Sequence, residues 1–390
     1  MIKPRYLQSS IRADLQKKMV FIGGPRQVGK TTFAQFIGKN NYKSYFYFNW
    51  DNLEDRKMII KGILPGEAGL IIFDEIHKYK KWKNYIKGIF DTHKSRYHII
   101  VTGSARLDLY RRGGDSMLGR YHYFSLHPFS VKELLNERPI IKINQELKFS
   151  KTEESQTIFG KLFTFGGFPE PFLKGDAATL RRFHNEYADK LVKEDIRDVE
   201  LVRDISALQV LVELLGERVG SLLSLNTLRA DMEVAHKTIS LWMDILERFY
   251  YHFRIYPFMS KKIRSLKKEP KMYLWDWSRV KDESIRFENI VASHLLKFAH
   301  FLYDKEGHRA ELYFLRDKEG REVDFLITVD RKPWIAVEAK QSSQEVSRHL
   351  RYFKDKLKIP FAYQVVNARD VDNREGDIRI ISAEKFLTGL

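Results

Sequence analysis

Residues 24–32 combine glycines, a lysine and threonines at a spacing that suits the binding of phosphate groups. They read Gly-Pro-Arg-Gln-Val-Gly-Lys-Thr-Thr, which fits the pattern G-x-x-x-x-G-K-[ST]. The glycines of such a loop let backbone N–H groups turn toward the phosphates of a nucleoside triphosphate. The lysine adds a positive charge for the β- and γ-phosphates, and the threonine after it offers its hydroxyl to Mg²⁺. The pattern predicts a nucleotide site that is formed by Gly24, Pro25, Arg26, Gln27, Val28, Gly29, Lys30, Thr31 and Thr32.

Two carboxylates follow an apolar segment further along the chain. Residues 69–75 are typical of a buried strand that ends in Asp74 and Glu75. In a nucleotide hydrolase of this kind, Asp74 belongs to the Mg²⁺ shell together with Thr31, and Glu75 polarises the attacking water. A buried strand that runs into a solvated acidic turn is the alternative, and the phosphate-binding loop upstream makes it the weaker interpretation. Lys30 and Glu75 are therefore the predicted catalytic residues of hydrolysis.

Small hydroxyl residues follow a third apolar segment, residues 97–102. We expect Ser104, rather than Thr102, to sense the γ-phosphate or to position water, although a simple strand-to-turn transition explains these residues nearly as well. Arg120 is our candidate for stabilising charge in the transition state, either within one chain or from a neighbouring subunit. A solvated surface position is the alternative for each arginine of this region, namely Arg106, Arg111, Arg112 and Arg120.

Regular elements around these residues would hold them in place. Residues 19–23 read as an apolar strand that leads into the loop, and residues 32–38 carry apolar side chains at helical spacing. A helix that starts at this point directs its positive end at the phosphates. Strand and helix alternation from about residue 18 to residue 125 predicts a parallel α/β sheet.

Two segments near the C-terminus, residues 322–329 and 334–340, read as a hairpin with charged residues where a buried strand should be apolar. Glu338 and Lys340 are two residues apart, so they share one face of their strand. Asp324 joins that face if it pairs with Glu338, which requires an odd number of loop residues. A two-residue turn without a bulge would place the two carboxylates on opposite faces.

On a shared face, Asp324 and Glu338 would hold a divalent cation, either Mg²⁺ or Mn²⁺. Lys340 would orient or deprotonate a water and stabilise charge on a phosphodiester, which makes all three residues candidates for catalysis. Glu288, in an amphipathic helix predicted over residues 287–296, would reach the same site or equally well face solvent. The spacing therefore predicts a metal site that acts on nucleic acid.

The middle of the chain favours a helix-turn-helix of the winged type. Residues 224–232 and 237–249 read as a short and a longer helix with a tight turn between them, and Ile239, Met243 and Leu246 share one face of the longer helix. One interpretation places Lys237, Thr238, Ser240 and Trp242 near nucleic acid. The alternative is a helical unit that packs within the protein. Local acidity favours the alternative, since residues 151–250 hold 13 lysines and arginines against 17 acidic residues.

The charge of the 390-residue chain is unevenly distributed. The net charge is +17, and residues 1–150 hold 27 lysines and arginines against 13 acidic residues. Residues 251–300 are also basic, with 11 lysines and arginines against 5 acidic residues. This asymmetry favours a polyanionic partner, DNA or RNA. A general richness in lysine that only aids solubility is the alternative.

The composition excludes several classes of protein. The chain has no cysteine, which excludes disulfides and thiolate metal sites and fits a reducing compartment. No apolar run approaches the roughly 20 residues that span a bilayer, and the first residues lack the apolar core of a signal peptide. We expect a cytoplasmic protein of two or three domains with no membrane partner.

Several segments resemble known families. Gly-Pro-Arg-Gln-Val-Gly-Lys-Thr-Thr, Leu-Ile-Ile-Phe-Asp-Glu-Ile-His, Ile-Ile-Val-Thr-Gly-Ser-Ala and Leu-Gly-Arg-Tyr resemble the prokaryotic AAA+-type ATPases. Gly-Gly-Phe-Pro-Glu and Lys-Met-Tyr-Leu-Trp-Asp are similar to the domain of unknown function that usually follows this ATPase. Glu-Val-Asp-Phe-Leu-Ile and Glu-Ala-Lys resemble the core of PD-(D/E)xK nucleases. One departure is Thr-Gly-Ser, with Ser104, where many AAA+ proteins place an asparagine.

The resemblance implies an α/β protein of three domains. These are a P-loop AAA+-type parallel-sheet domain over residues 1–140, a helical and winged-helix-like domain over 141–270, and an α/β restriction-endonuclease-like domain over 271–390. It also implies an ATP site at Lys30, Thr31, Asp74 and Glu75, and a nuclease-like triplet of Asp324, Glu338 and Lys340.

Two functions from different classes fit these features. The preferred one is a Mg²⁺-dependent ATPase that acts on DNA and whose nuclease-like domain binds DNA and has the residues to cut it. The other is a nucleotide-dependent switch that recognises a protein partner, with an inactive nuclease-like fold as the binding platform. A homo-oligomer is compatible with both functions.

Overall fold

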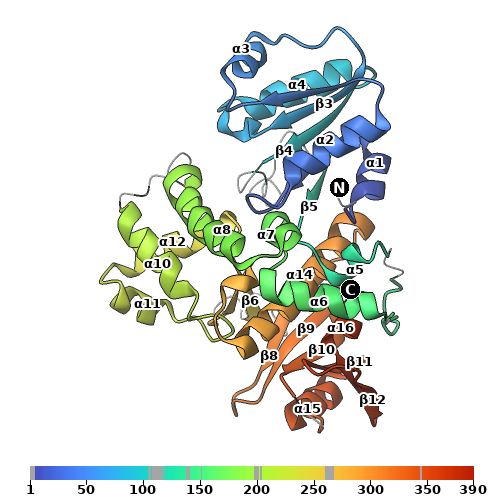
Figure 1. Cartoon of the computed structure of the whole chain (residues 1–390), viewed down its shortest axis with the longest axis vertical. Helices are drawn as coiled ribbons and strands as arrows, with labels where there is room; N and C mark the ends of the chain where they lie inside the picture. The colour runs from blue at the N-terminus through green and yellow to red at the C-terminus, as the bar shows by residue number, and fades with distance from the viewer. Residues whose placement is uncertain are drawn as a thin grey trace. The chain divides into compact units, whose positions relative to one another are not determined.

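The computed structural model describes residues 5–103, 107, 117, 119–137, 141–150, 152–196, 202, 204–259, 268–342 and 345–390. The chain divides into two compact units, which Figure 1 draws in one view. The first unit holds the described residues up to His127 together with residues 248–250, and the second holds the other described residues. No helix among the described residues has both the length and the apolar character needed to cross a membrane.

The first unit is built on a five-stranded sheet with the order β2-β3-β4-β1-β5, in which all pairs of neighbours are parallel. The predicted parallel α/β arrangement is therefore confirmed. Its inner strands are apolar, and Phe21, Phe73 and Val101 are fully buried. The elements are α1 Gln8–Leu15, β1 Met19–Gly23, α2 Lys30–Asn41, β2 Tyr45–Asn49, α3 Leu53–Lys61, β3 Gly69–Asp74, η1 Ile76–Lys78, α4 Trp82–His93, β4 Tyr97–Thr102 and β5 Tyr121–Ser125.

The strand order brings the chemically important loops together. All five strands run in one direction, so the residues that follow β1, β3 and β4 lie at the same carboxyl edge of the sheet. Asp74 at the end of β3 is level with Thr102 at the end of β4 and with Asn49 at the end of β2.

The first half of the second unit is helical. In α12, Ile239, Met243 and Leu246 are buried, as their spacing predicted. Trp242 is buried as well, so its ring packs inside the protein and is not available for contact with nucleic acid. The helices are α5 Val131–Leu134, α6 Glu153–Phe165, α7 Pro169–Lys174, α8 Ala177–Lys190, η3 Leu191–Ile196, α10 Ile205–Leu215, α11 Leu225–Asp231 and α12 His236–Arg248.

The second half of this unit contains an eight-stranded mixed sheet with the order β12-β13-β11-β10-β9-β8-β6-β7. Helices α14 and α15 pack against it, and Figure 1 shows both beside its strands. The elements are β6 His252–Pro257, β7 Lys271–Leu274, η4 Trp277–Arg279, α14 Glu283–Glu306, β8 Ala310–Arg316, β9 Glu322–Val329, β10 Lys332–Lys340, α15 Arg348–Leu357, β11 Phe361–Val366, β12 Asp372–Glu375, β13 Ile378–Ser382, α16 Ala383–Phe386 and η5 Leu387–Gly389.

Strands β6 and β7 connect the helical half to the sheet. They pair with each other in antiparallel fashion, and β6 also pairs in parallel with β8 at Tyr256 and Pro257. Leu222, between α10 and α11, forms a bridge with Lys271 at the start of β7. The third predicted domain begins at residue 271, so its first strand is hydrogen-bonded to β6 of the predicted middle domain.

Candidate functional site

The predicted phosphate-binding loop joins β1 to α2. Gly24 and Gly29 both have positive φ angles, of 148° and 94°. A Cβ atom at Gly24 would come within 2.3 Å of the Leu126 carbonyl oxygen, so this position requires glycine. The guanidinium of the buried Arg5 donates a hydrogen bond of 2.9 Å to the carbonyl of Val28. The loop is therefore held by a residue that the sequence did not single out.

Lys30 is the first residue of α2 and is almost fully buried. Its Nζ donates to the carbonyl oxygens of Gly24 and Pro25 at 2.9 and 2.8 Å. The ammonium therefore lies across the loop, and the positive end of α2 faces the same region. Both features suit the binding of an anion.

Asp74 accepts hydrogen bonds from three hydroxyl groups that belong to three different elements. Its Oδ2 atom accepts from Thr31 at 2.7 Å and from Tyr47 at 2.8 Å, and Oδ1 accepts from Thr102 at 2.5 Å. Burial and the adjacent Asp74 carboxylate raise the pKa of Tyr47 well above its ordinary value, so this phenol remains a donor. Hydroxyl and carboxylate oxygens are the ligands that Mg²⁺ prefers, so Thr31 and Asp74 fit this ion.

Glu75 follows directly and ends the strand. Its φ of 53° is left-handed, a conformation that costs a residue with a side chain about 1–2 kcal/mol. The backbone N–H donates to the Thr102 carbonyl at 3.1 Å, which anchors the turn to β4. The Glu75 side chain is about one-quarter exposed, and its Oε2 lies 3.5 Å from Nε2 of the buried His77. This carboxylate is therefore positioned by its neighbours and open to water.

The predictions for Ser104 and Arg120 have different outcomes. Ser104 lies outside the described residues, and Thr102 supplies one of the three hydroxyls at Asp74. Arg120 precedes β5, and its guanidinium binds Asp91 of α4 with contacts of 2.7 and 3.1 Å. Met19 pairs with Tyr121, so Arg120 lies at the amino edge of the sheet. The phosphate-binding loop is at the other edge, roughly 15 Å away along a five-residue strand. Arg120 therefore cannot reach the phosphate-binding loop of its own chain. Its action at the loop of a neighbouring subunit remains a proposal.

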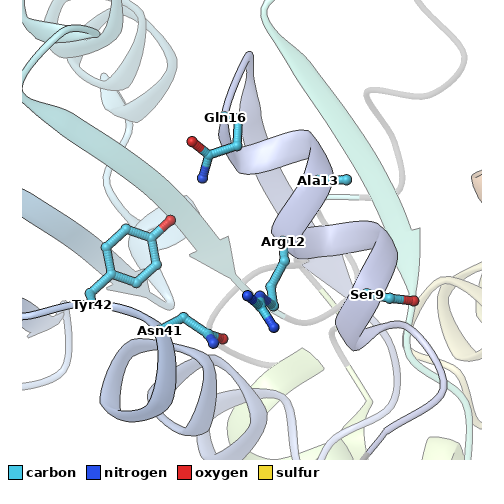
Figure 2. Close-up of a pocket in the computed structure, with 6 residues that line it drawn as sticks. All are labelled: Ser9, Arg12, Ala13, Gln16, Asn41 and Tyr42. Carbon is cyan, nitrogen blue, oxygen red and sulfur yellow. The ribbon is translucent and has the colours of Figure 1, made fainter.

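A separate cavity of about 520 Å³ opens between α1 and the end of α2. Figure 2 shows Arg12 reaching from α1 toward Asn41. The Tyr42 hydroxyl is hydrogen-bonded to Nδ1 of His98 at 2.7 Å. Asn41 and Lys30 are at opposite ends of α2, roughly 17 Å apart at 1.5 Å per residue, so this cavity is distinct from the phosphate-binding loop. Its lining residues are Ser9, Arg12, Ala13, Gln16, Asn41 and Tyr42.

The C-terminal hairpin brings Asp324 and Glu338 together by an unexpected route. Its turn has two residues, Asp330 and Arg331, both with positive φ. An even turn alone would separate the carboxylates, but the register shifts by one residue between Pro333 and Ile335. Such a bulge returns the two carboxylates to opposed positions.

Hydrogen bonds and an ion pair link these carboxylates to their neighbours. The Asp324 N–H donates to Glu338 Oε2 at 3.4 Å, the Ala339 N–H donates to Asp324 Oδ2 at 2.9 Å, and Lys340 Nζ lies 2.8 Å from Glu338 Oε1. Burial, and then the charge of Asp324, raise the pKa of both Glu338 and Glu288 to about 7. Asp324, Glu338, Lys340 and Glu288 therefore belong to one electrostatically coupled cluster.

A further residue of this cluster, Lys271, was not predicted. Its Nζ lies 2.6 Å from Glu322 Oε1 and 3.4 Å from both Glu288 Oε1 and Asp324 Oδ1. Burial lowers the pKa of Lys271, but the charges of Glu288, Asp324 and Glu322 outweigh it and raise the pKa above its ordinary value. Within the described parts of the chain, no group of three or more histidine, cysteine or acidic residues is arranged to hold a metal ion.

Comparison with known families agrees with the N-terminal site. Residues 16–135 match the AAA domain family. This part of the chain is an AAA-type nucleotide-binding ATPase domain. Downstream of the AAA domain, residues 156–280 match the domain of unknown function DUF8612, and residues 285–386 match the domain of unknown function DUF4143.

Relatives of the whole chain occur in archaea and bacteria. Uncharacterized protein MJ1544 of Methanocaldococcus jannaschii is 24% identical over 89% of this chain and 82% of its own length. Uncharacterized protein Rv2008c of Mycobacterium tuberculosis is 20% identical over 90% of this chain and 77% of its own length.

Solved structures resemble the chain more loosely. The RuvB Holliday junction branch migration motor of Thermotoga maritima has a TM-score of 0.29 and 17% identity, over 67% of this chain and 94% of its own. AMPPCP-bound DnaA of Aquifex aeolicus has a TM-score of 0.31 and 15% identity, over 62% of this chain and 86% of its own. Scores this low do not indicate a shared overall fold, so the assignment of the AAA domain rests on the family match and the site geometry.

Proposed function

We propose that this protein is a Mg²⁺-dependent ATPase that acts on DNA. The observation that carries the proposal is the pairing of the Thr31 hydroxyl with the Asp74 carboxylate beside a phosphate-binding loop, with Glu75 next in the chain. Mg²⁺ neutralises phosphate charge when it is bound at such a pair. Lys30 binds the β- and γ-phosphates, Thr31 and Asp74 hold the ion, and Glu75 takes the proton of the attacking water.

A neighbouring subunit would supply the arginine of this reaction. Arg120 is about one-third exposed and lies at the sheet edge away from its own phosphate-binding loop, where another copy of the chain could meet it. This placement supports a homo-oligomer in which Arg120 stabilises transition-state charge in the adjacent site.

Charge supports DNA as the polymer on which the ATPase acts. The AAA domain lies in the most basic part of the chain, where 27 lysines and arginines face 13 acidic residues over residues 1–150. The middle of the chain adds the element order α10, Leu222 bridge, α11, α12, β6 and β7, which is the order of a winged helix. Lys237 of α12 is exposed and Thr238 and Ser240 are partly exposed, so these three remain candidates for phosphate contact.

The nuclease-like end is proposed to bind DNA without cutting it. Asp324, Glu338 and Lys340 have the spacing and the shared face of a PD-(D/E)xK site, which supports a nuclease-like origin. The ammonium of Lys271, 3.4 Å from Asp324 Oδ1, favours an inactive site. A switch that recognises a protein through this part is the second candidate, and the acidic residues 151–250 favour it.

The choice between DNA and a protein partner has a direct test in salt dependence. We expect affinity for duplex or single-stranded DNA, measured by fluorescence anisotropy, to fall at least about 100-fold between 50 and 200 mM salt, because phosphate contacts release counterions. We also expect DNA to stimulate ATP hydrolysis. Absence of DNA binding at low salt, together with salt-insensitive binding to a protein, would favour the switch.

Cleavage is tested with supercoiled plasmid and Mg²⁺ or Mn²⁺. We expect the wild-type chain and Lys340→Ala to leave the plasmid equally intact, because the carboxylates already have an internal cation. Lys332→Ala, at an exposed position of the same strand, is the matched control. Nicking that is lost in Lys340→Ala and kept in Lys332→Ala would identify a live nuclease site and contradict this expectation.

A further inference from the structure

A buried lysine lies at the centre of the nuclease-like carboxylate cluster. The Lys271 side chain is only 5% exposed, and three carboxylates converge on its ammonium. Two of them, Glu322 and Asp324, come from β9, and Glu288 comes from α14. A lysine this deeply buried needs opposite charges around it, and these residues supply them.

This arrangement leaves no room for a divalent cation between Glu288 and Asp324. Mg²⁺ requires oxygen ligands at about 2.0–2.1 Å in near-octahedral geometry. Instead, one oxygen of each carboxylate lies 3.4 Å from the ammonium, which bridges the two carboxylates. The other Asp324 oxygen accepts the Ala339 N–H, and Glu338 Oε1 contacts Lys340. The facing oxygens of Glu288 and Asp324 thus have an ammonium N–H donor between them, so these two carboxylates do not fit a shared metal ion.

We infer that Lys271 is a built-in cation that replaces a divalent metal between Glu288 and Asp324, so that a metal binds there only when this ammonium is removed. The inference rests on the proposed nuclease-like arrangement of the C-terminal part and is independent of ATP hydrolysis. It gives the carboxylates a structural task in place of a catalytic one.

That task is the attachment of β7 to β9 and α14. Lys271 begins β7, which pairs with β6 and bridges Leu222 of the helical half. Tyr273, two residues further along and so on the same face, donates a hydrogen bond of 2.6 Å to Glu288 Oε1. Two side chains of one short strand therefore bind the same carboxylate of α14. A metal that entered this site would displace the lysine that joins these elements.

Mn²⁺ titration of the 390-residue chain tests the inference. All variants carry Asp74→Asn, which weakens metal binding at the phosphate-binding loop, and the samples contain neither nucleotide nor DNA. Bound Mn²⁺ is counted by electron paramagnetic resonance of the free ion. Lys271→Met keeps most of the apolar stem and removes the charge, and Lys268→Met, at an exposed position nearby, is the matched control.

We expect Lys271→Met to bind one Mn²⁺ at least about tenfold more tightly than the background protein, because a like charge a few ångströms away opposes the ion. Adding Asp324→Asn should remove that site, and Lys268→Met should gain nothing. A background protein that binds Mn²⁺ through Asp324 as tightly as the Lys271→Met variant would overturn the inference, and so would a folded Lys271→Met protein with no gain. If Lys271→Met does not fold, titration of the background protein with and without Asp324→Asn still decides the question. Mn²⁺ binding at Asp324 does not depend on ATP hydrolysis. The proposal for Lys271 and the proposed ATPase function can therefore fail independently of each other.

Discussion

A Lys30→Ala protein should hydrolyse ATP at least about 100-fold more slowly than the wild-type chain, since removal of one pre-positioned group at developing charge has effects of this order. Lys30 is buried at the start of α2, and its ammonium lies across the loop that should bind the phosphates. Alanine removes this charge together with the two hydrogen bonds that Nζ donates to the loop carbonyls of Gly24 and Pro25. Phosphate release at several ATP and Mg²⁺ concentrations gives kcat and KM. We expect kcat to fall and KM to rise, because Lys30 contacts the nucleotide before and during the reaction.

Lys39→Ala is the matched control for this substitution. Lys39 is in the last turn of the same helix and is exposed, so its loss changes the net charge equally without touching the loop. Its turnover should stay close to that of the wild type. A Lys30→Ala protein with the turnover of Lys39→Ala would mean that the loop does not bind the phosphates of ATP.

The nucleotide site was predictable because its residues are close in sequence or belong to one sheet edge. Gly24, Gly29, Lys30 and Thr31 form a local motif, and a parallel sheet places the end of β3 at the same edge, with β4 between β3 and β1. Tyr47 was not predictable in the same way. It belongs to an aromatic strand, Tyr-Phe-Tyr-Phe, that reads as core, and only the pairing of β2 with β3 brings its hydroxyl to Asp74.

The C-terminal cluster shows what pattern reasoning misses at longer range. The shared face of Asp324 and Glu338 was expected from an odd loop, yet it arises from a two-residue turn and a bulge. Hydrophobic alternation does not reveal a single extra residue in a strand, although that residue reverses which side chains share a face. Lys271 is 53 residues from Asp324, and its place in the cluster depends on the pairing of β7 at the far side of the sheet.

The two sites use the same residue types with opposite results. At Asp74 the carboxylate oxygens accept hydrogen bonds from the neutral hydroxyl groups of Thr31, Tyr47 and Thr102, which do not themselves neutralise its negative charge. At Asp324 a buried ammonium lies 3.4 Å from the carboxylate and compensates the charge within the chain. The type of neighbour, rather than the presence of carboxylates, therefore separates a site suited to a metal from an internal ion-pair cluster.

A Glu75→Gln protein should bind ATP with nearly unchanged affinity and hydrolyse it about 100 to 10,000 times more slowly, because general-base catalysis contributes factors of this size. Glutamine has almost the same shape as glutamate but cannot take a proton from water. The turn should persist, because the Glu75 backbone N–H anchors it to the Thr102 carbonyl at 3.1 Å.

The two variants should differ in ATP binding. Lys30→Ala should weaken ATP binding and slow turnover together, whereas Glu75→Gln should keep ATP bound without hydrolysing it. Equilibrium binding of a fluorescent ATP analogue, combined with single-turnover hydrolysis, separates the two effects. Glu54→Gln, at an exposed position in the first turn of α3, is the matched control and should hydrolyse ATP normally. If Glu75→Gln turns over at the rate of this control, Glu75 does not activate the water. The proton of the attacking water would then have to be taken by another group at the carboxyl edge of the sheet.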